Sequence, residues 1–267
     1  MAAPVVLLAG GVGGAKLAYG LQERLGSGLV THIERQPVDV DLALRQWQTY
    51  VAALETAGWE IIHVPPMDEC PDGVFIEDDV VMYGDRAVVA RPGADERKPE
   101  TAAIADLLGA LGYDVVSIEA PGTLDGGDVL KHDGTVWVGI GGRTNQSGID
   151  QLTAYLEPYG ARVVPVPISK VLHLKSAVTA LPDGTVVGYE PLVDDPQVWP
   201  SFLDVPETSG SHVVLLGENR ILMSADAPES KRLFEERGLD VVAVDISEFI
   251  KLEGCVTCLS VRLRHTP

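Results

Sequence analysis

Hydrophobic and polar positions follow one short pattern at four places along the chain. Each copy is a β-rich run, a tight polar turn (Gly-Asp, Asp-Gly or Gly-Glu-Asn) and a second β-rich run, which predicts a β-hairpin. The four predicted hairpins are EDDVVMYGDRAVVA (77–90), GGDVLKHDGTVWVG (126–139), SAVTALPDGTVVGY (176–189) and SHVVLLGENRILMS (211–224). Four copies of one pattern indicate an internal repeat.

The first, second and fourth hairpins are each followed by a helical pattern and a further strand. The predicted helices cover 100–112, 148–160 and 228–238, and each ends at a glycine suited to a helix C-terminus. The strands that follow cover 113–118, 161–167 and 239–245. The repeat is therefore strand, strand, helix, strand over about 45–50 residues, a period typical of arrays and propellers.

A fifth copy is predicted to combine the two ends of the chain. The helix over 38–58 leads into the strand WEIIHVP (59–65). Its apolar face, at helical spacing, is predicted to consist of Val40, Leu44, Trp47, Val51 and Leu54. The segment GCVTCLSVRL (254–263) is predicted as a strand without a partner, and PVVLLA (4–9) can pair with it and close a ring. We therefore expect an α/β fold with five units around an axis, in a single catalytic domain over 1–267 with an atypical N-terminal segment over 1–28.

Charge narrows the classes of ligand. Acidic residues outnumber basic ones 39 to 20, a formal net charge of −19, which would repel a nucleic acid. The same field favours a small cationic ligand, although an acidic surface also serves solubility. No run of eighteen apolar residues occurs, so we expect no membrane span. The N-terminus lacks the basic start of a secretory signal, which favours the cytoplasm.

Residues whose side chains can take part in catalysis recur where the hairpins begin. In a ring of repeated units, these positions converge on the axis. They are Asp72, Glu77 and Asp78 in the first unit, Asp125 and Asp128 in the second, His173 in the third, His212 in the fourth and Cys258 in the fifth. A single aspartate before a tight turn often only caps that turn. The whole set favours a reaction site on the axis.

The Cys-Val-Thr-Cys motif at 255–258 has three interpretations. A redox pair belongs at a strand-to-helix junction, whereas Cys258 leads into LSVRL, so we expect Cys255 and Cys258 to point in different directions. Structural zinc needs four ligands, no second such motif occurs, and we expect no metal. A single nucleophile, Cys258, with His173 as acid and base is the remaining functional interpretation. The alternative is a small buried apolar residue.

A glycine-rich segment and a pair of arginines are two further candidates for ligand binding. LAGGVGGAKLA (8–18) lacks the Gly-Lys-Ser/Thr of a phosphate loop and has Lys16 where the dinucleotide fingerprint needs a small residue. We therefore expect no cofactor, and a phospho-ligand site on this glycine turn remains an alternative. Arg97 and Arg143 follow the second strands of their hairpins, where a pair of arginines suits a ligand carboxylate.

Taken together, the motifs resemble the dimethylarginine dimethylaminohydrolase family of the guanidino-group-modifying superfamily. The resemblance covers roughly 29–263. It rests on PDGVFIEDD (71–79), RPGADERKPET (91–101), TLDGGDVL (123–130), GRTNQSG (142–148), HLKSAVTALPDGT (173–185) and VTCLS (256–260). Residues 1–26 instead resemble the start of the phospholactate transferase family.

The resemblance implies a five-bladed, pseudo-symmetric α/β propeller. It also implies a dimethylargininase, a C–N hydrolase that converts Nω-methylated arginines to citrulline through a cysteine S-alkylthiouronium intermediate. Cys258 would be the nucleophile and His173 the acid and base, and Asp125 would bind the guanidinium and assist the histidine. The residues that would bind substrate are Asp72, Glu77 and Asp78 around the cation and Arg97 and Arg143 at the α-carboxylate. Alternatives are an arginine deiminase-type enzyme and a catalytically impaired methylarginine-binding protein. We expect a small cationic amino acid as the partner, and a monomer or homodimer.

Overall fold

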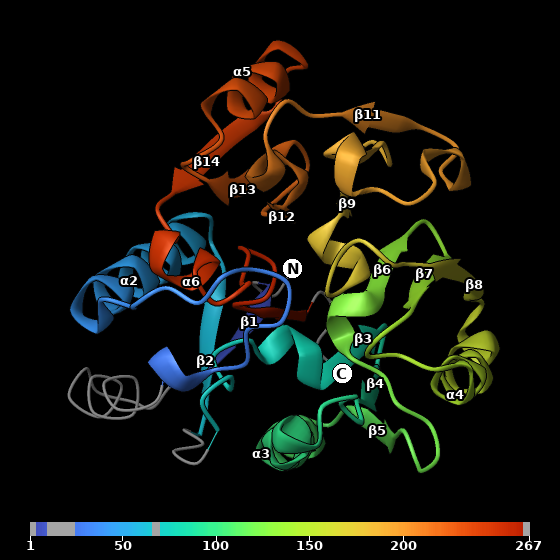
Figure 1. Ribbon diagram of the computed structural model, residues 1–267. Coiled ribbons are helices and arrows are strands. Elements are labelled where there is room, and N and C mark those ends of the chain that lie inside the picture. Colours follow the sequence, from blue (N-terminus) through green and yellow to red (C-terminus); the bar gives the residue numbers. More distant parts are fainter. Residues whose placement is uncertain (1–3, 10–24, 66–69, 264–267) are drawn as a thin grey trace.

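The computed structural model describes residues 4–9, 25–65 and 70–263. Within them, five three-stranded sheets stand as blades around a common axis (Figure 1). In each sheet the central strand pairs with one neighbour antiparallel and with the other parallel. The predicted five-bladed α/β propeller is confirmed.

The four predicted hairpins and their third strands form four of the blades. The first blade is β3 (Val80–Tyr83), β4 (Arg86–Val89) and β5 (Asp114–Ser117), and the second is β6 (Val129–His132), β7 (Thr135–Ile140) and β8 (Arg162–Pro167). The third is β9 (Val178–Ala180), β10 (Val186–Gly188) and β11 (Phe202–Asp204), and the fourth is β12 (Val213–Leu215), β13 (Arg220–Ser224) and β14 (Asp240–Val244).

Helices cover the outside of the ring. They are α2 (Val40–Thr56), α3 (Thr101–Ala110), α4 (Gln146–Leu156), α5 (Pro228–Glu236) and the short α6 (Ser247–Ile250). The third blade has no such helix between β10 and β11. It has two 3-10 turns there, each with a proline in its first turn (Pro191 and Pro196). Trp199 follows them and packs edge-on against Trp137 of the second blade, with ring centroids 5.4 Å apart.

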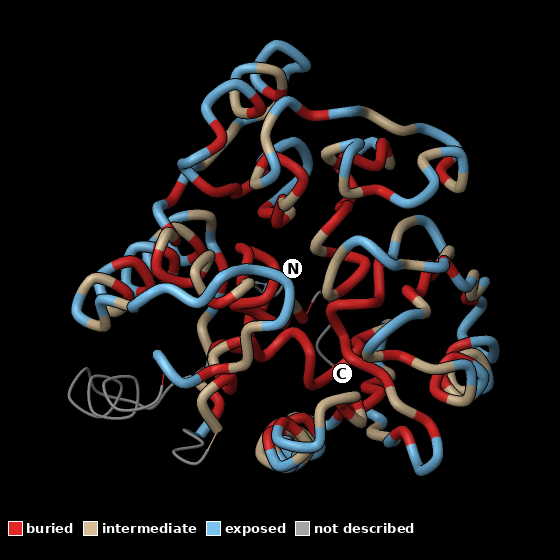
Figure 2. The backbone as a smooth tube through the Cα atoms, viewed as in Figure 1, coloured by how far each residue is buried: buried red, intermediate tan, exposed pale blue. Residues whose placement is uncertain are grey.

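The fifth blade closes the ring. β1 (Val5–Ala9) lies between β15 (Val261–Leu263), its antiparallel partner, and β2 (Glu60–Val64), its parallel partner. Val6 and Leu8 join the apolar cluster that includes α2, whereas Leu7 joins the cluster that includes α3. Buried residues gather toward the axis and exposed ones on the outer helices (Figure 2). The expected pairing of the N-terminal strand with the C-terminal one is confirmed.

Two details of the fifth unit differ from expectation. Most of the predicted strand over 254–263 is not a strand, because 256–259 form a turn and only β15 pairs. The buried face of α2 includes Ala43 and Tyr50 beside Trp47 and Leu54. Three expected members of that face, Val40, Leu44 and Val51, are only half-buried. Tyr50, on the buried face, donates from its hydroxyl to the Val256 carbonyl at 2.9 Å and so ties the helix to the turn.

Two other expectations concern the N-terminal segment and the membrane. The glycine turn expected within 8–18 lies outside the described residues, except for Leu8 and Ala9. Among the helices that the structure describes, none has the length and apolar character needed to cross a membrane.

Candidate active site

Each blade brings a short turn to the axis just before its first strand. Four of these turns are 3-10 turns, at Ile76–Asp79, Gly126–Asp128, Leu174–Ser176 and Thr208–Ser211, and the fifth is the turn at 256–259. The Glu77 amide donates to the Cys258 carbonyl at 3.2 Å, which joins the first turn to the fifth. The residues that the structure buries around the axis are Asp72, Glu77, Asp78, Asp125, Asp128, His173, Cys255 and Cys258.

His173 lies between two carboxylates. Its Nε2 is 3.0 Å from Asp125 Oδ2, and its Nδ1 is 3.7 Å from Asp78 Oδ1. Burial alone would lower the pKa of His173, but Asp78 and the hydrogen bond to Asp125 outweigh it and raise the pKa to about 9. A β-carbon on Gly127 would lie 2.6 Å from the imidazole Nδ1, so only glycine fits against this ring. The imidazole is therefore held in one position and carries a proton at neutral pH.

Two aspartates of the second blade fix the histidine and the chain next to it. Asp125 accepts a hydrogen bond from the Gly93 amide at 2.8 Å with its other oxygen. Burial raises the pKa of Asp125, but the hydrogen bond and charge of His173 outweigh it, so the pKa lies below its usual value. Asp128 accepts from the Leu174 amide at 2.9 Å and from Thr144 Oγ1 at 2.6 Å. Asp128 therefore anchors the backbone beside His173, a role that the sequence did not reveal.

The two predicted carboxylate-binding arginines differ in what surrounds them. The Arg97 guanidinium is buried, pairs with Asp78, and donates from Nη2 to Glu100 Oε2 at 2.7 Å. It also donates to two backbone carbonyls, and its pKa is well above the usual value despite burial, because of the charges of Asp78 and Glu100. Arg143 is half-buried, and its side chain has no hydrogen bond or ion pair with any residue that the structure describes. Of these two arginines, Arg143 is the one whose guanidinium pairs with no carboxylate among the described residues.

Asp72 and a downstream acid anchor the segment that follows the undescribed residues 10–24. Both carboxylate oxygens of Asp72 accept from the Leu29 amide, at 3.1 and 3.0 Å. Glu253 accepts from the amides of Thr31, His32 and Ile33. Burial raises the pKa of Asp72, while the hydrogen bond from the Leu29 amide opposes that rise. The segment over 28–33 is thereby tied to the residues that precede two of the axial turns, those at 76–79 and 256–259.

The carboxylate of Glu77 pairs with two cations of the chain itself. Its Oε1 lies 2.7 Å from Lys175 Nζ and 2.9 Å from Arg262 Nη2. All three side chains line a cavity of about 680 Å³. Burial opposes ionisation, yet these two cations hold the pKa of Glu77 below its usual value. Lys175 and Arg262 escaped notice in the sequence, where Lys175 stands two residues after His173 and Arg262 four after Cys258.

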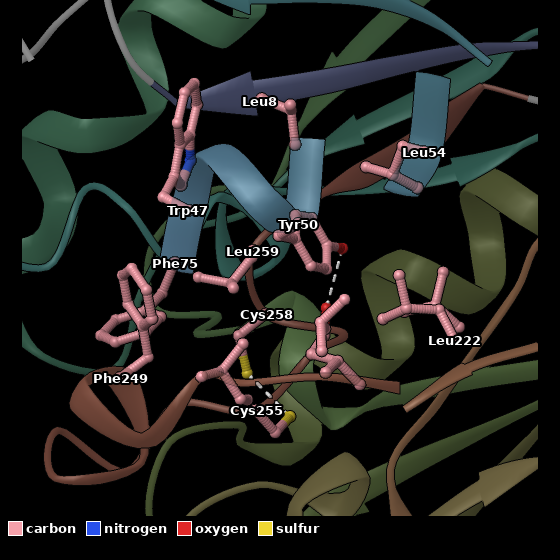
Figure 3. Close-up of a cluster of buried hydrophobic side chains, with 14 of the residues drawn as sticks. Leu8, Trp47, Tyr50, Leu54, Phe75, Leu222, Phe249, Cys255, Cys258 and Leu259 are labelled. Carbon is pink, nitrogen blue, oxygen red and sulfur yellow. Dashed lines mark hydrogen bonds between the residues drawn. The ribbon is translucent and has the colours of Figure 1, made fainter. Parts of the chain in front are cut away.

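The two cysteine side chains meet at the turn. The Cys258 amide donates to the Cys255 carbonyl at 3.1 Å, and the two Sγ atoms are also 3.1 Å apart (Figure 3). The expectation that they point in different directions is wrong, because the segment is a turn rather than a strand. The hydrogen bond with Cys255, burial, and the charges of Glu77 and Asp78 hold the pKa of Cys258 well above its usual value.

On its other side, Cys255 lines a second cavity, of about 250 Å³, together with His32 and His212. The His212 ring bonds to the Ser176 carbonyl at 3.0 Å. Among the described residues, no group of three or more histidine, cysteine or acidic side chains is arranged to hold a metal ion.

The chain resembles known proteins over nearly its whole length. No protein-family model matches the chain. The chain is 60% identical over 242 residues to the N(G),N(G)-dimethylarginine dimethylaminohydrolase of Streptomyces coelicolor, covering 91% of this chain and 94% of that protein. It also matches the Pseudomonas aeruginosa dimethylarginine dimethylaminohydrolase, solved as a cysteine-to-serine mutant with citrulline, at a TM-score of 0.87 and 29% identity. A histidine-to-glycine variant of a dimethylarginine dimethylaminohydrolase, as its adduct with S-methyl-L-thiocitrulline, matches with the same values. Each of these two matches covers 98% of this chain and 100% of the other.

Proposed function

The chain belongs to the dimethylarginine dimethylaminohydrolase family, and on that premise we infer the reaction and the part that each residue plays in it. It is a hydrolase that converts Nω-methylated arginines to citrulline and dimethylamine or methylamine. The 60% identity over nearly the whole chain supports this activity, as does the citrulline bound to the structurally similar Pseudomonas protein.

Cys258 is the proposed nucleophile. It is buried at the axis beside Asp78 and Glu77, and the similar proteins were solved with a cysteine or a histidine replaced. Its raised pKa favours the thiol in the empty site. A guanidinium bound against the same carboxylates adds a positive charge, which favours the thiolate at the moment when it is needed. The thiolate then attacks the guanidinium carbon and forms a tetrahedral adduct.

His173 is the proposed acid and base. With a pKa of about 9 it is protonated when the substrate arrives, so it can donate its proton to the departing amine. The carbon–nitrogen bond breaks and leaves an S-alkylthiouronium on Cys258. The neutral imidazole next takes a proton from water, whose oxygen attacks the same carbon. The carbon–sulfur bond then breaks, and citrulline leaves.

The substrate is held by charges on either side of the reacting carbon. We propose that Asp78 and Asp125, which flank His173, face the guanidinium, with Asp72 at the other end of the pocket. Arg143, whose charge acts on Asp72, is the proposed ligand of the α-carboxylate. The same role for Arg97 would require its guanidinium to leave Asp78 and Glu100. Glu77, paired with Lys175 and Arg262, would contribute negative charge from behind the cysteine.

The observation that carries the proposed mechanism is the position of the His173 imidazole between the carboxylates of Asp78 and Asp125. The test is citrulline release from asymmetric dimethylarginine, monomethylarginine and arginine, by the wild-type chain and by Cys258→Ser. We expect release from the methylated substrates only, and none from the variant. Faster release from arginine would indicate a deiminase, and binding without release a catalytically impaired protein. The cytoplasmic location and the monomeric or homodimeric state remain predictions.

A further inference from the structure

Cys255 has no part in the reaction just described, yet its sulfur lies against the proposed nucleophile. The two Sγ atoms are 3.1 Å apart, and the backbone between them forms a hydrogen-bonded turn. A disulfide has a sulfur–sulfur bond of about 2.05 Å and needs Cα atoms closer than about 7 Å, which a four-residue turn provides. The sulfur atoms would therefore have to approach by only about 1 Å. Such an approach needs a rotation of side chains and no change of fold.

Cys255 is also the cysteine that a small molecule can reach from a second direction. It lines the cavity of about 250 Å³, whose wall includes His32, Ser176 and His212. Cys258 does not line that cavity. A small oxidant entering this space would meet Cys255 first, whereas the substrate site is reserved for the guanidinium at Cys258.

The surroundings of Cys255 favour its thiolate, which is the reactive form of a cysteine. The hydrogen bond with Cys258 lowers the pKa of Cys255 to about 5 against the effect of burial, and the charge of His212 adds to this. Thr257 Oγ1, 3.2 Å from the sulfur, can donate to the same thiolate. Of the two sulfurs, the one whose thiolate is favoured is therefore that of Cys255, which also faces the cavity.

We propose that Cys255 and Cys258 are a reversible oxidation site, in which a peroxide converts the two thiols to an intramolecular disulfide. The Cys255 thiolate attacks one oxygen of hydrogen peroxide, the oxygen–oxygen bond breaks, and the released hydroxide takes a proton to form water. Cys255 is then a sulfenic acid. The Cys258 sulfur, on losing its proton, attacks the Cys255 sulfur and expels the second oxygen as water. Two thiols lose two electrons in total, and one peroxide becomes two waters.

This oxidation would switch the enzyme off. In the disulfide the sulfur of Cys258 is bonded to that of Cys255, so no thiolate is left to attack the guanidinium carbon. A dithiol reductant regenerates both thiols and restores activity. The effect on turnover rests on the proposed role of Cys258, whereas disulfide formation does not. Cys255 would also protect its neighbour, because a sulfur in a disulfide is shielded from further oxidation to sulfinic acid.

The test treats the reduced chain with hydrogen peroxide and follows citrulline release and the mass of the peptide that contains both cysteines. For the wild type we expect near-complete loss of activity, a mass lower by two hydrogen atoms, and recovery with dithiothreitol. Cys255→Ser, measured against its own untreated rate, should form no disulfide. It should accumulate sulfinic acid at Cys258 and fail to recover. The matched control, Cys70→Ser, lacks the third cysteine and should behave as the wild type does.

The outcomes separate the two proposals. Singly oxidised cysteines without a disulfide in the wild type would overturn the oxidation site, as would full recovery of Cys255→Ser. A disulfide that leaves turnover intact would support the oxidation site and contradict Cys258 as the nucleophile.

Discussion

At the scale of single residues, the histidine held between two carboxylates links folding to pH. The pKa of His173 is about 9 in the folded chain, against about 6.5 for a solvated histidine. The proton is therefore bound more tightly in the folded state. Its contribution to stability is complete below about pH 6.5 and is lost as the pH rises through 9, a change on the order of 3 kcal/mol.

We therefore expect His173→Gln to flatten this part of the pH dependence. Urea unfolding at pH 6.5, 7.5 and 9 would measure the free energy of unfolding of both chains, and that of the wild type should fall more steeply. Citrulline release by the wild type should also fall above about pH 9, because the acid is then deprotonated. Equal slopes in the two chains would contradict a proton held by Asp78 and Asp125.

Replacement of Arg97 should mainly lower stability, whereas replacement of Arg143 should mainly weaken substrate binding. Arg97→Ala leaves Asp78 and Glu100 buried without their cation, which should cost about 3–5 kcal/mol of stability. Arg143→Ala removes no hydrogen bond or ion pair within the described residues and should leave the melting temperature almost unchanged. It should instead raise KM by roughly 10- to 150-fold, the value of a charge-assisted hydrogen bond to a carboxylate.

Melting curves and KM values for both variants check this division. Nω,Nω-dimethylagmatine, which keeps the methylated guanidinium but lacks the α-carboxylate, supplies the control: the wild type and Arg143→Ala should use it equally poorly. An unchanged KM in Arg143→Ala, or an unaltered melting temperature in Arg97→Ala, would count against these roles.

At the scale of elements, the backbone over 31–33 is held by one carboxylate, that of Glu253, from the turn that precedes the cysteines. Glu253 accepts from three consecutive amides of this segment, and its φ of 63° places it in the left-handed region. Glu253→Ala should release these amides, so their hydrogen exchange should accelerate. Since Asp72 holds the neighbouring Leu29 and lines the proposed pocket, kcat/KM should fall as well.

Glu218→Ala is a suitable control for that experiment. Glu218 is an exposed acid in the hairpin turn of the fourth blade, and its removal changes the net charge equally. Accelerated exchange over 31–33 in both variants would point to charge rather than to the specific hydrogen bonds.

The sequence predicted those elements whose signals are local. Alternating apolar positions and glycine-containing turns mark each hairpin. The helical pattern that ends at Gly112 predicts that the next segment is the strand β5. The prediction of the fifth unit was less accurate, because contacts between the two ends of the chain determine its structure. The Tyr50 hydroxyl of α2 donates to the Val256 carbonyl, which lies 206 residues later and which no local pattern links to Tyr50.

For the site, too, the sequence predicted what depends on local pattern and missed what depends on contacts between distant segments. Acidic, imidazole and thiol groups at matched positions of the repeat predicted convergence at the axis. Asp78, Asp125 and His173 do meet there, whereas His212 lines a separate cavity. The sequence did not predict which hydrogen-bond or ion-pair partner each of these side chains has. Whether Arg97 faces a ligand or Asp78, and whether Glu77 faces the substrate or Lys175, depends on side-chain packing between units. The 3.1 Å contact of the cysteines likewise depends on where strand pairing stops.

At the scale of the whole molecule, β1 couples the first blade to the fourth. Leu7 is fully buried in the cluster with Ile76 and Ile104, and Leu8 is fully buried in the cluster with Leu222. A single domain, as we propose, should therefore unfold as one unit. Leu7→Ala should lower the free energy of unfolding by about 2–5 kcal/mol, with circular dichroism and residual activity changing at the same temperature. Two separate transitions would contradict a single domain.

The third blade has a contact of a different kind, the edge-on pair of Trp137 and Trp199, formed where a helix is missing. Indoles this close share their excited states, so their near-ultraviolet circular dichroism bands should split into a couplet that isolated tryptophans lack. The chain has two other tryptophans, Trp47 and Trp59, and both belong to the cluster beneath α2. The couplet would therefore report on one seam of the ring alone, so a spectrometer could tell a loosening between the second and third blades from an opening beside the cysteines.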